Sequence, residues 1–338
     1  MATTDKSHLS PAKVAHSVRR GVALYSYQEE LFVGQMNLED CLRECSDIGA
    51  HSIEVLAEMV VPDFPNPGDA WIEKWHEWMA RYRLNPVCYT QFIDTLRTKS
   101  HNLTVTEGVQ TMLRDIRLAK QLGIRKIRAL IGTPVDILEA TVPHLEKEGV
   151  WMGVELHAPI TIGGRLVERL LKIADKTDNL GFVPDLGIFQ SKPNPYARDR
   201  AIRDGRLGAD AAAHIETSWA ARLDKAKVSA EIAKMASNAG AQAYLDQIYE
   251  ITPQNPRDLE PIMAKCRHIH GKTWGLTEDC VDPVIDLTNV IPALVEGGFD
   301  GVIATEYEGQ RLVQDVSPFS EVEMIRRHHV MLRRMLGA

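Results

Sequence analysis

The architecture can be read first from WMGVELH (151–157), an apolar run that ends on an acidic and an imidazole side chain. Three later runs have the same form: LGFVPDLG (180–187), CRHIHGKTW (266–274) and GVIATEYEG (301–309). Short apolar runs of this kind, bounded by turn residues and helical patterns, are typical of buried strands in a parallel sheet. Each run closes on a residue that can bind a metal ion, in order Glu155, Asp185, His270 and Glu306.

Strand-like runs alternate with helical ones along the whole chain, which indicates βα units and a parallel sheet. We expect earlier strands at 21–28, 52–58, 86–93 and 126–132, and helices at 38–49, about 104–122, about 135–148 and about 164–176. Asn37 is the expected N-cap of the first of these helices. The prediction is an α/β fold, a single (β/α)8 TIM barrel over residues 20–338, preceded by a polar extension at 1–19.

The regular spacing breaks in the second half of the chain. His270 follows Asp185 by 85 residues, against 30 from Glu155 to Asp185 and 36 from His270 to Glu306. One βα unit cannot use that length, so we expect a long insertion after strand six, at about 190–225. An insertion at this end of a barrel usually forms a lid or an interface.

Composition and charge exclude several classes of protein. A net charge of −7 argues against a broad nucleic-acid footprint, and no run reaches the roughly 18 apolar residues of a membrane-spanning helix. The first twenty residues are polar and lack the apolar core of a signal peptide. Five cysteines, an odd number, fit a reducing compartment, so a cytoplasmic location is expected. GxSxG and CxxC motifs are absent from the sequence.

The four strand-end residues predict a metal site. Hard divalent cations prefer oxygen-rich ligand sets that include at most one imidazole, converging from different parts of the chain. The C-terminal ends of neighbouring barrel strands bring such residues to one face. Any single carboxylate of the four could be a solvated loop residue, but ligand-type residues at the ends of four successive strands favour a site. We therefore expect an open centre for Mn²⁺, Mg²⁺ or Co²⁺ that acts on a small oxygenated substrate.

Further candidates follow from the alternation of side chains along a strand. His157 lies on the same side as Glu155, one step nearer the rim of the barrel. Lys272 likewise shares the inward face with His270, where it can either pair with a ligand carboxylate or contact the substrate. Glu54 in the second strand has the same two options, an ion pair inside the barrel or a substrate contact.

Two other groups of residues are expected to have structural roles. Trp71, Trp75 and Trp78 fall at helical spacing, which predicts a packing face. His328 and His329 lie on the last predicted helix, at about 318–335, and we expect them to face solvent and not a metal ion.

The order of the ligands resembles that of the xylose-isomerase-like barrel superfamily, which includes sugar-phosphate isomerases and epimerases, inosose dehydratases and endonuclease IV. The shared pattern is Glu at strand five, Asp at strand six, His in an H-x-K segment of strand seven (HGK, 270–272) and Glu at strand eight. The resemblance covers nearly the whole chain after about residue 20. It departs from ketose 3-epimerases, because the His and Arg that usually hold substrate oxygens after strands six and seven are missing here.

A narrower resemblance rests on three features: the long insertion, the LYSYQEE segment (24–30) and His157 after Glu155. In these the chain looks like the α subunits of bacterial C-glycoside deglycosylases. The resemblance implies Mn²⁺ binding and a small β subunit within a higher oligomer. It also implies cleavage of the carbon–carbon bond between sugar and aglycone in 3-oxo-C-glycosides.

Both readings begin with removal of a proton next to a sugar carbonyl, which a divalent cation assists as a Lewis acid. In an epimerase or isomerase, Glu155 and Glu306 would remove and return the proton from opposite faces. In the lyase we expect His157 to be the acid/base, because imidazole titrates near neutrality. Alternatively His157 orients Glu155 through a hydrogen bond. A third class also stays open, a metal-containing barrel subunit whose role is binding or assembly.

Overall fold

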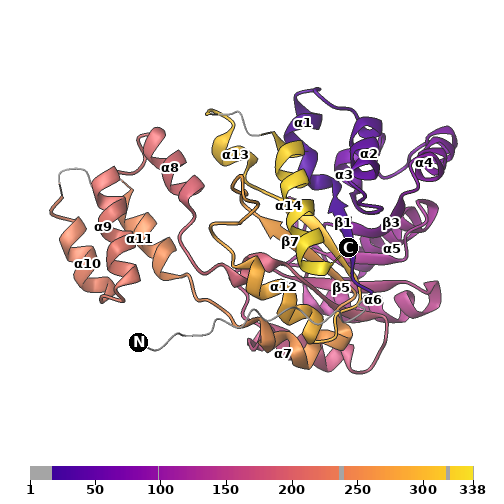
Figure 1. Cartoon of the computed structure of the whole chain (residues 1–338). Helices are drawn as coiled ribbons and strands as arrows, with labels where there is room; N and C mark the ends of the chain where they lie inside the picture. The colour runs from indigo at the N-terminus through magenta and orange to yellow at the C-terminus, as the bar shows by residue number, and fades with distance from the viewer. Residues whose placement is uncertain (1–16, 98, 236–239, 317–319, 338) are drawn as a thin grey trace, which may run out of the picture.

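A computed structural model of the chain describes residues 17–97, 99–235, 240–316 and 320–337 (Figure 1). Its sheet has eight parallel strands in the order β6-β5-β4-β3-β2-β1-β8-β7. The strands are β1 (Arg19–Ala23), β2 (Ser52–Leu56), β3 (Asn85–Gln91), β4 (Lys126–Ala129), β5 (Trp151–Leu156), β6 (Leu180–Pro184), β7 (His268–Thr273) and β8 (Val302–Tyr307). Most of the expected extension at 1–19 lies outside the described residues. The first strand ends at Ala23, where a 3-10 turn (η1, Leu24–Tyr27) replaces the rest of the expected run.

The sheet closes on itself between its two outer strands. β6 and β7 meet through isolated parallel bridges, one of which pairs Asp185 with His270. The approach is so close that a Cβ atom added to Gly181 would lie 2.1 Å from the carbonyl oxygen of Lys265, so only glycine fits there. The predicted (β/α)8 barrel is confirmed, and its seam runs through two of the predicted metal ligands.

Helices surround the barrel, as Figure 1 shows. They are α1 (Gln28–Phe32), α2 (Leu38–Asp47), α3 (Ala57–Val60), α4 (Asp69–Arg81), α5 (Val105–Gln121), α6 (Val135–Glu148), α7 (Arg165–Ala174), α12 (Leu287–Glu296), α13 (Gln310–Val313) and α14 (Glu321–Leu336), with 3-10 turns η2 (Leu186–Phe189) and η3 (Pro256–Lys265). Asn37 caps α2 in a capping box with Asp40, as expected. Gly123 follows α5 with φ +80, a left-handed conformation that suits glycine after a helix.

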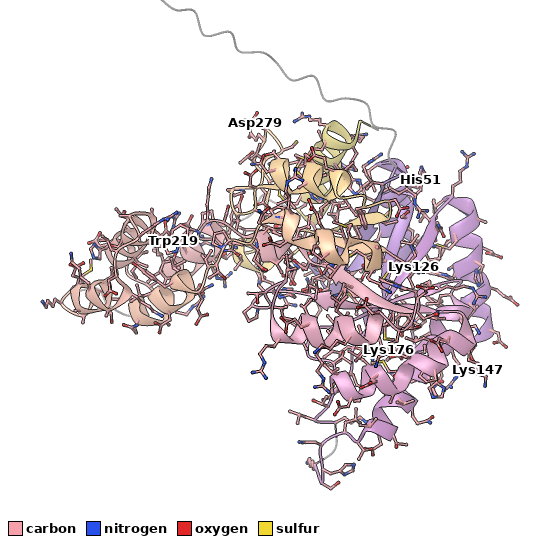
Figure 2. All side chains as sticks on the ribbon, turned by 90° about the horizontal axis from the view of Figure 1, so that it is seen from below. His51, Lys126, Lys147, Lys176, Trp219 and Asp279 are labelled. Atoms are coloured by element: carbon pink, nitrogen blue, oxygen red, sulfur yellow. The ribbon has the colours of Figure 1, made fainter. Side chains whose placement is uncertain are left out.

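Four helices between β6 and β7 form a separate lobe beside the barrel: α8 (Pro195–Arg203), α9 (Ala209–Ala220), α10 (Lys225–Ile232) and α11 (Ala241–Tyr249). Figure 1 shows them extending away from the barrel, and Figure 2 places Trp219 on this lobe, far from Lys126 and Lys147. The lobe has its own apolar core, which includes Ile215 and Leu245. The helices run to Tyr249, so the excursion is longer than the 190–225 expected from spacing.

The main apolar core fills the layer between the strands and the surrounding helices. Trp75 is fully buried, and its ring stacks on that of Trp71 with centroids 5.8 Å apart, so the expected packing role of these tryptophans is confirmed. The helix that carries Trp75 is held further by a hydrogen bond from its indole N–H to the carbonyl oxygen of Leu122. In the described part of the chain, no helix is long and apolar enough to cross a membrane.

The expectation that His328 and His329 face solvent is wrong. Both are fully buried on the face of α14 that packs against the barrel. The hydroxyl of Thr305 lies 2.7 Å from Nδ1 of His328 and 3.1 Å from Nε2 of His329. The amphipathic pattern of this helix did not predict that the two polar rings lie inward. The rings can be buried because a threonine on β8 satisfies part of their hydrogen bonding.

Candidate metal centre

The four predicted ligands come together at the C-terminal end of the barrel strands. Ligand atoms of Glu155, Asp185, His270 and Glu306 all lie within 4.8 Å of one another, and all four side chains are buried. Glu155 and Glu306 belong to β5 and β8, His270 to β7, and Asp185 follows β6 directly. This group, called the acidic cluster below, has the composition and convergence of a site for a hard divalent cation.

Strand alternation and register bring these side chains to the same end of the barrel. Asp185 pairs with His270 across the barrel seam, and Glu306 pairs with Lys272 on the neighbouring strand. Because alternate residues of a strand face the same side, His268, His270 and Lys272 all lie on the inner face of β7 at successive heights. The expected order, with Lys272 nearer the mouth than His270, follows from the strand direction.

Glu54 holds the imidazole of His270 from below. Its Oε2 lies 2.7 Å from Nε2 of His270 and 2.6 Å from Nε2 of His268. The other ring nitrogen of His270, Nδ1, is buried without a hydrogen-bond partner and lies 3.0 Å from Oε1 of Glu306. The structure therefore points Nδ1 of His270 into the acidic cluster, and Glu54 is positioned to fix the tautomer that leaves this atom free.

Glu54 thus lies beneath His270, with both carboxylate oxygens engaged. Its Oε1 accepts hydrogen bonds from Thr90 (2.5 Å) and from Nε of Arg128 (2.9 Å). Of the two options that the sequence left for Glu54, the geometry favours the ion pair inside the barrel over a substrate contact. His270 and Arg128 hold the pKa of Glu54 well below its usual range, against the opposing effect of burial.

Arg128 is the main residue of this region that sequence reasoning missed. It is buried on β4, where its Nη1 donates to Oε1 of Glu155 over 2.6 Å and its Nε donates to Glu54. Burial lowers the pKa of the guanidinium, but Glu155 and Glu54 outweigh burial and raise it. Arg128 is thus a permanent cation on one side of the acidic cluster. In the run KIRALIG, Arg128 can be recognised only as a strand residue. The sequence does not reveal its partners, because they come from strands distant in the chain.

Lys272 lies on the other side of the cluster and is also buried. Its Nζ is 3.3 Å from Oδ2 of Asp185, 3.2 Å from Oε2 of Glu306 and 2.5 Å from Oε2 of Glu308. Burial lowers its pKa, but Asp185 and the two glutamates outweigh burial and hold the pKa well above its usual value. Tyr25, another residue that sequence reasoning did not single out, donates its hydroxyl to Glu308 over 3.0 Å.

The charges in this region do not balance without a further cation. Five buried or half-buried carboxylates, those of Glu54, Glu155, Asp185, Glu306 and Glu308, face Arg128, Lys272 and the ring of His270. Burial lowers the pKa of His270, but Glu306 and Glu54 outweigh burial and raise it to about 10, so the ring is a third cation, and the carboxylates are still in excess. Burial raises the pKa of Asp185, Lys272 only partly offsets the rise, and the nearby carboxylate of Glu306 adds to it. A divalent cation would offset most of the excess. With the unpartnered Nδ1 of His270, this shows that the residues present fit a metal ion.

A second group of potential ligands lies deeper in the barrel. Glu54, Cys88 and His268 also bring ligand atoms within 4.8 Å of one another. Burial raises the pKa of the Cys88 thiol well above its usual value, so the soft ligand stays protonated. Glu54 is already shared between Arg128 and two imidazoles. Of these two groups, the acidic cluster is therefore the better candidate for a hard cation.

His157 lies at the rim and outside the acidic cluster. It is half-buried at the end of β5, and its Nδ1 lies 2.7 Å from the carbonyl oxygen of Ala158. A positive charge on His157 would oppose the rise in the pKa of the Asp185 carboxyl. No hydrogen bond joins His157 to Glu155 in the described structure, so the geometry gives no support to an orienting contact between them.

Comparisons with known proteins agree with this architecture. A family model described as xylose isomerase-like TIM barrel matches residues 42–334. Among solved structures, a sugar phosphate isomerase/epimerase from Parabacteroides distasonis superimposes with a TM-score of 0.58 at 14% identity, covering 96% of each chain. An L-ribulose 3-epimerase has a TM-score of 0.55 at 12% identity, covering 95% of each chain. At these identities the structural matches establish the fold alone.

Relatives of known function are similar over almost their full length. A C-glycoside deglycosidase alpha subunit of Arthrobacter globiformis is 22% identical, with 97% of this chain and 95% of the relative covered. A 3'-dehydrocarminate deglycosidase alpha subunit of a Microbacterium species is 24% identical, with 94% of this chain and 95% of the relative covered. Both relatives are designated alpha subunits, which implies a partner subunit in their enzymes.

Proposed function

This chain belongs to the xylose isomerase-like TIM-barrel family, and we propose that it is the metal-binding subunit of a carbon–carbon lyase. The proposed reaction releases the aglycone of a 3-oxo-C-glycoside. The observation that carries the proposal is the acidic cluster, into which His270 turns an unpartnered ring nitrogen. The narrower choice of reaction is supported by the full-length similarity to deglycosidase alpha subunits.

Glu155, Asp185, His270 and Glu306 would hold the cation, which we propose to be Mn²⁺, with Mg²⁺ or Co²⁺ as alternatives. When bound, a divalent cation supplies Lewis-acid stabilisation of the oxyanion that develops next to the carbon losing its proton. Lys272 lies above the cluster, with its ammonium group between Asp185, Glu306 and Glu308, where it can hold a hydroxyl or carbonyl oxygen of the sugar in place of one of these carboxylates.

His157 is the proposed acid/base of the reaction. As a neutral imidazole it takes the proton from C2 of the 3-oxo sugar, and the C2–H electron pair becomes the enolate next to the C3 carbonyl. The enolate then forms a C1–C2 double bond while the bond from C1 to the aglycone carbon breaks. The leaving carbon keeps that electron pair and receives a proton from the imidazolium, so the step is redox-neutral and returns His157 to its starting state.

An epimerase or isomerase acting through an enediolate is the second candidate. In that reaction Glu155 and Glu306, which face each other across the cluster, would act as the two bases. The ion pair between Arg128 and Glu155 counts against it, because a carboxylate oxygen that already accepts a hydrogen bond from a guanidinium at 2.6 Å is less available to take a carbon-bound proton. A subunit that binds ligand or assembles a complex without turnover is the remaining alternative.

Mass spectrometry of reactions in D₂O tests the proposal. The Mn²⁺-loaded chain, alone and with the product of a neighbouring gene, is supplied with a 3-oxo-C-glucoside and, separately, with ketohexoses. Free aglycone is the expected result. Deuterium in an intact sugar would show the epimerase instead, and no reaction under any condition would favour the binding role. Size-exclusion chromatography of the same samples tests whether a small second subunit and a higher oligomer are required.

A further inference from the structure

A cleft lies between the helical lobe and the barrel, next to the acidic cluster. Its barrel side is formed by the loop after β5, with Pro159 and Ile160, and by η2. Its lobe side is formed by α8, by α11 and by the segment that follows α11. Its volume is about 420 Å³, which falls within the range of small-molecule sites.

Two residues that line the cleft lie next to the proposed metal site. Gly187 lines the cleft, and its N–H donates to Oδ1 of Asp185 over 2.6 Å. A Cβ atom at Gly187 would lie 3.4 Å from Cγ of Lys272. Ala158, whose carbonyl oxygen lies 2.7 Å from Nδ1 of His157, lines the same cleft. The cleft therefore adjoins the acidic cluster through backbone that also contacts Asp185 and His157.

The walls of the cleft are held in place from both sides. The side chain of Gln254 accepts a hydrogen bond from the backbone N–H of Ile162 (2.7 Å) and donates to the carbonyl oxygen of Ile160 (3.1 Å). This glutamine follows the lobe, so it joins the end of the lobe to the loop after β5. At the other end, Arg203 of α8 forms an ion pair with Asp315. The cleft is thus built into the fold and does not depend on a ligand to form.

The chemistry of the lining selects for a neutral, largely apolar ligand. Isoleucines line both sides of it, Ile160 and Ile188 from the barrel and Ile248 and Ile251 from α11 and the segment that follows it. Within the described residues that line the cleft, Glu250 is the only side chain with a formal charge, and no lysine, arginine or histidine is present. A phosphate group would find no cation there, whereas aromatic rings with hydroxyl groups match apolar walls interrupted by amides.

We propose that this cleft is the aglycone subsite, and that it binds a neutral aromatic, polyphenolic ring system while the sugar occupies the acidic cluster. This inference rests on the proposed function for the identity of the ligand. It gives the aglycone, which is the leaving part of the substrate, a binding site. It also assigns recognition of the aglycone to the helical lobe. The lobe wall then determines how large an aglycone the enzyme accepts.

Filling the cleft tests the proposal without touching the metal ligands. Ala197 on α8 and Gln247 on α11 line it from the lobe side, and both are at least partly exposed, so Ala197→Phe and Gln247→Trp add a ring without enlarging a closed core. Ala213→Phe on the exposed face of α9 is the matched control. Isothermal titration of the Mn²⁺-loaded protein, with its partner subunit where one is needed, uses a free dihydroxyflavone as the probe.

The expected result is at least a tenfold loss of flavone affinity in both cleft variants and wild-type affinity in Ala213→Phe. Turnover of a 3-oxo-C-glucosyl flavone should fall by a similar factor, while that of a 3-oxo-C-glucosyl phenol stays within about twofold. Unchanged affinity and selectivity in both cleft variants would overturn the subsite, even with active enzyme. Flavone binding that the cleft variants abolish, in a protein that cleaves neither glycoside, would support the subsite and reject the proposed reaction.

Discussion

Oε2 of Glu54 lies 2.7 Å from Nε2 of His270, and this contact leaves Nδ1 of the ring to face the acidic cluster. A carboxylate that fixes the tautomer of a ligand imidazole typically contributes ten- to a hundredfold in metal affinity. We therefore expect Glu54→Gln to weaken Mn²⁺ binding by about 10- to 100-fold. Titration calorimetry on the metal-free protein measures the change.

The exposed Glu58, which follows the same strand, provides the control. Glu58→Gln should bind Mn²⁺ as the wild type does, and circular dichroism should show both variants folded. A Glu54→Gln protein with wild-type affinity would mean that His270 is oriented by other contacts, or that it does not bind the ion through Nδ1.

Removal of the ammonium group of Lys272 gives a second specific prediction. Lys272→Met leaves Asp185, Glu306 and Glu308 without their shared ammonium group. Breaking a buried ion pair from one side costs about 3–5 kcal/mol, so the metal-free variant should unfold at a much lower temperature. Mn²⁺ should recover part of the loss, because it restores positive charge to two of the same carboxylates.

Thermal unfolding with and without Mn²⁺ checks this, with Lys176→Met as the exposed control. The expected sign is a larger metal-induced rise in Tm for Lys272→Met than for wild type or control. If Mn²⁺ raises the Tm of all three proteins equally, the charges of Lys272 and the ion do not act on the same carboxylates, and the proposed arrangement is wrong.

The fold was predictable because the helix caps, the apolar runs and the strand alternation all indicate the same architecture. Asn37 caps the helix that its position predicted, and Gly123 ends another. The apolar run at 151–157 became a strand whose last residues reach the barrel mouth. Strand alternation then determined which side chains face inward, so four ligand-type residues could be placed together without knowledge of their distances.

What the sequence could not reveal is which distant side chains meet. Arg128 contacts Glu54 and Glu155, which lie 74 and 27 residues away in the chain, so no local pattern links the three. The inward position of His328 depends on a single buried hydroxyl on another element. The length of the helical lobe was also underestimated. The lobe has a small apolar core of its own, so its sequence has the composition of an ordinary helical segment and does not stand out from the helices of the barrel.

Substitution of His157 distinguishes the chemical step from metal binding. Because it lies outside the acidic cluster, His157→Ala should keep wild-type Mn²⁺ affinity. Loss of a general acid/base typically costs 10²–10⁴-fold, so kcat for aglycone release should fall by about that factor. His51, an exposed histidine that Figure 2 labels, gives the control variant His51→Ala, whose metal affinity and kcat should both be unchanged.

Two outcomes would count against this role of His157. Wild-type kcat in His157→Ala would remove the residue from the reaction. A parallel loss of Mn²⁺ affinity and turnover would instead mean that His157 acts through the metal ligands, as an orienting residue would.

His328 predicts how stability depends on pH. Its buried ring contacts Thr305 through Nδ1, while Nε2 has no hydrogen-bond partner, and burial lowers the pKa of the ring to about 3. The folded state therefore binds this proton more weakly than the unfolded chain, in which histidine titrates near 6.5. Stability from this group is fully present above about pH 6.5 and is lost as the pH falls towards 3, with a slope of up to about 1.4 kcal/mol per pH unit.

His328→Met removes this titration and retains an apolar side chain of similar reach. Urea unfolding of the metal-free protein at several values between pH 4 and pH 7 should show a shallower fall in unfolding free energy than in wild type. The fall should not vanish, because burial also lowers the pKa of the neighbouring His329. His51→Met, which replaces an exposed ring, should keep the wild-type slope. An identical slope in His328→Met and wild type would show that the ring is not held neutral inside the folded barrel.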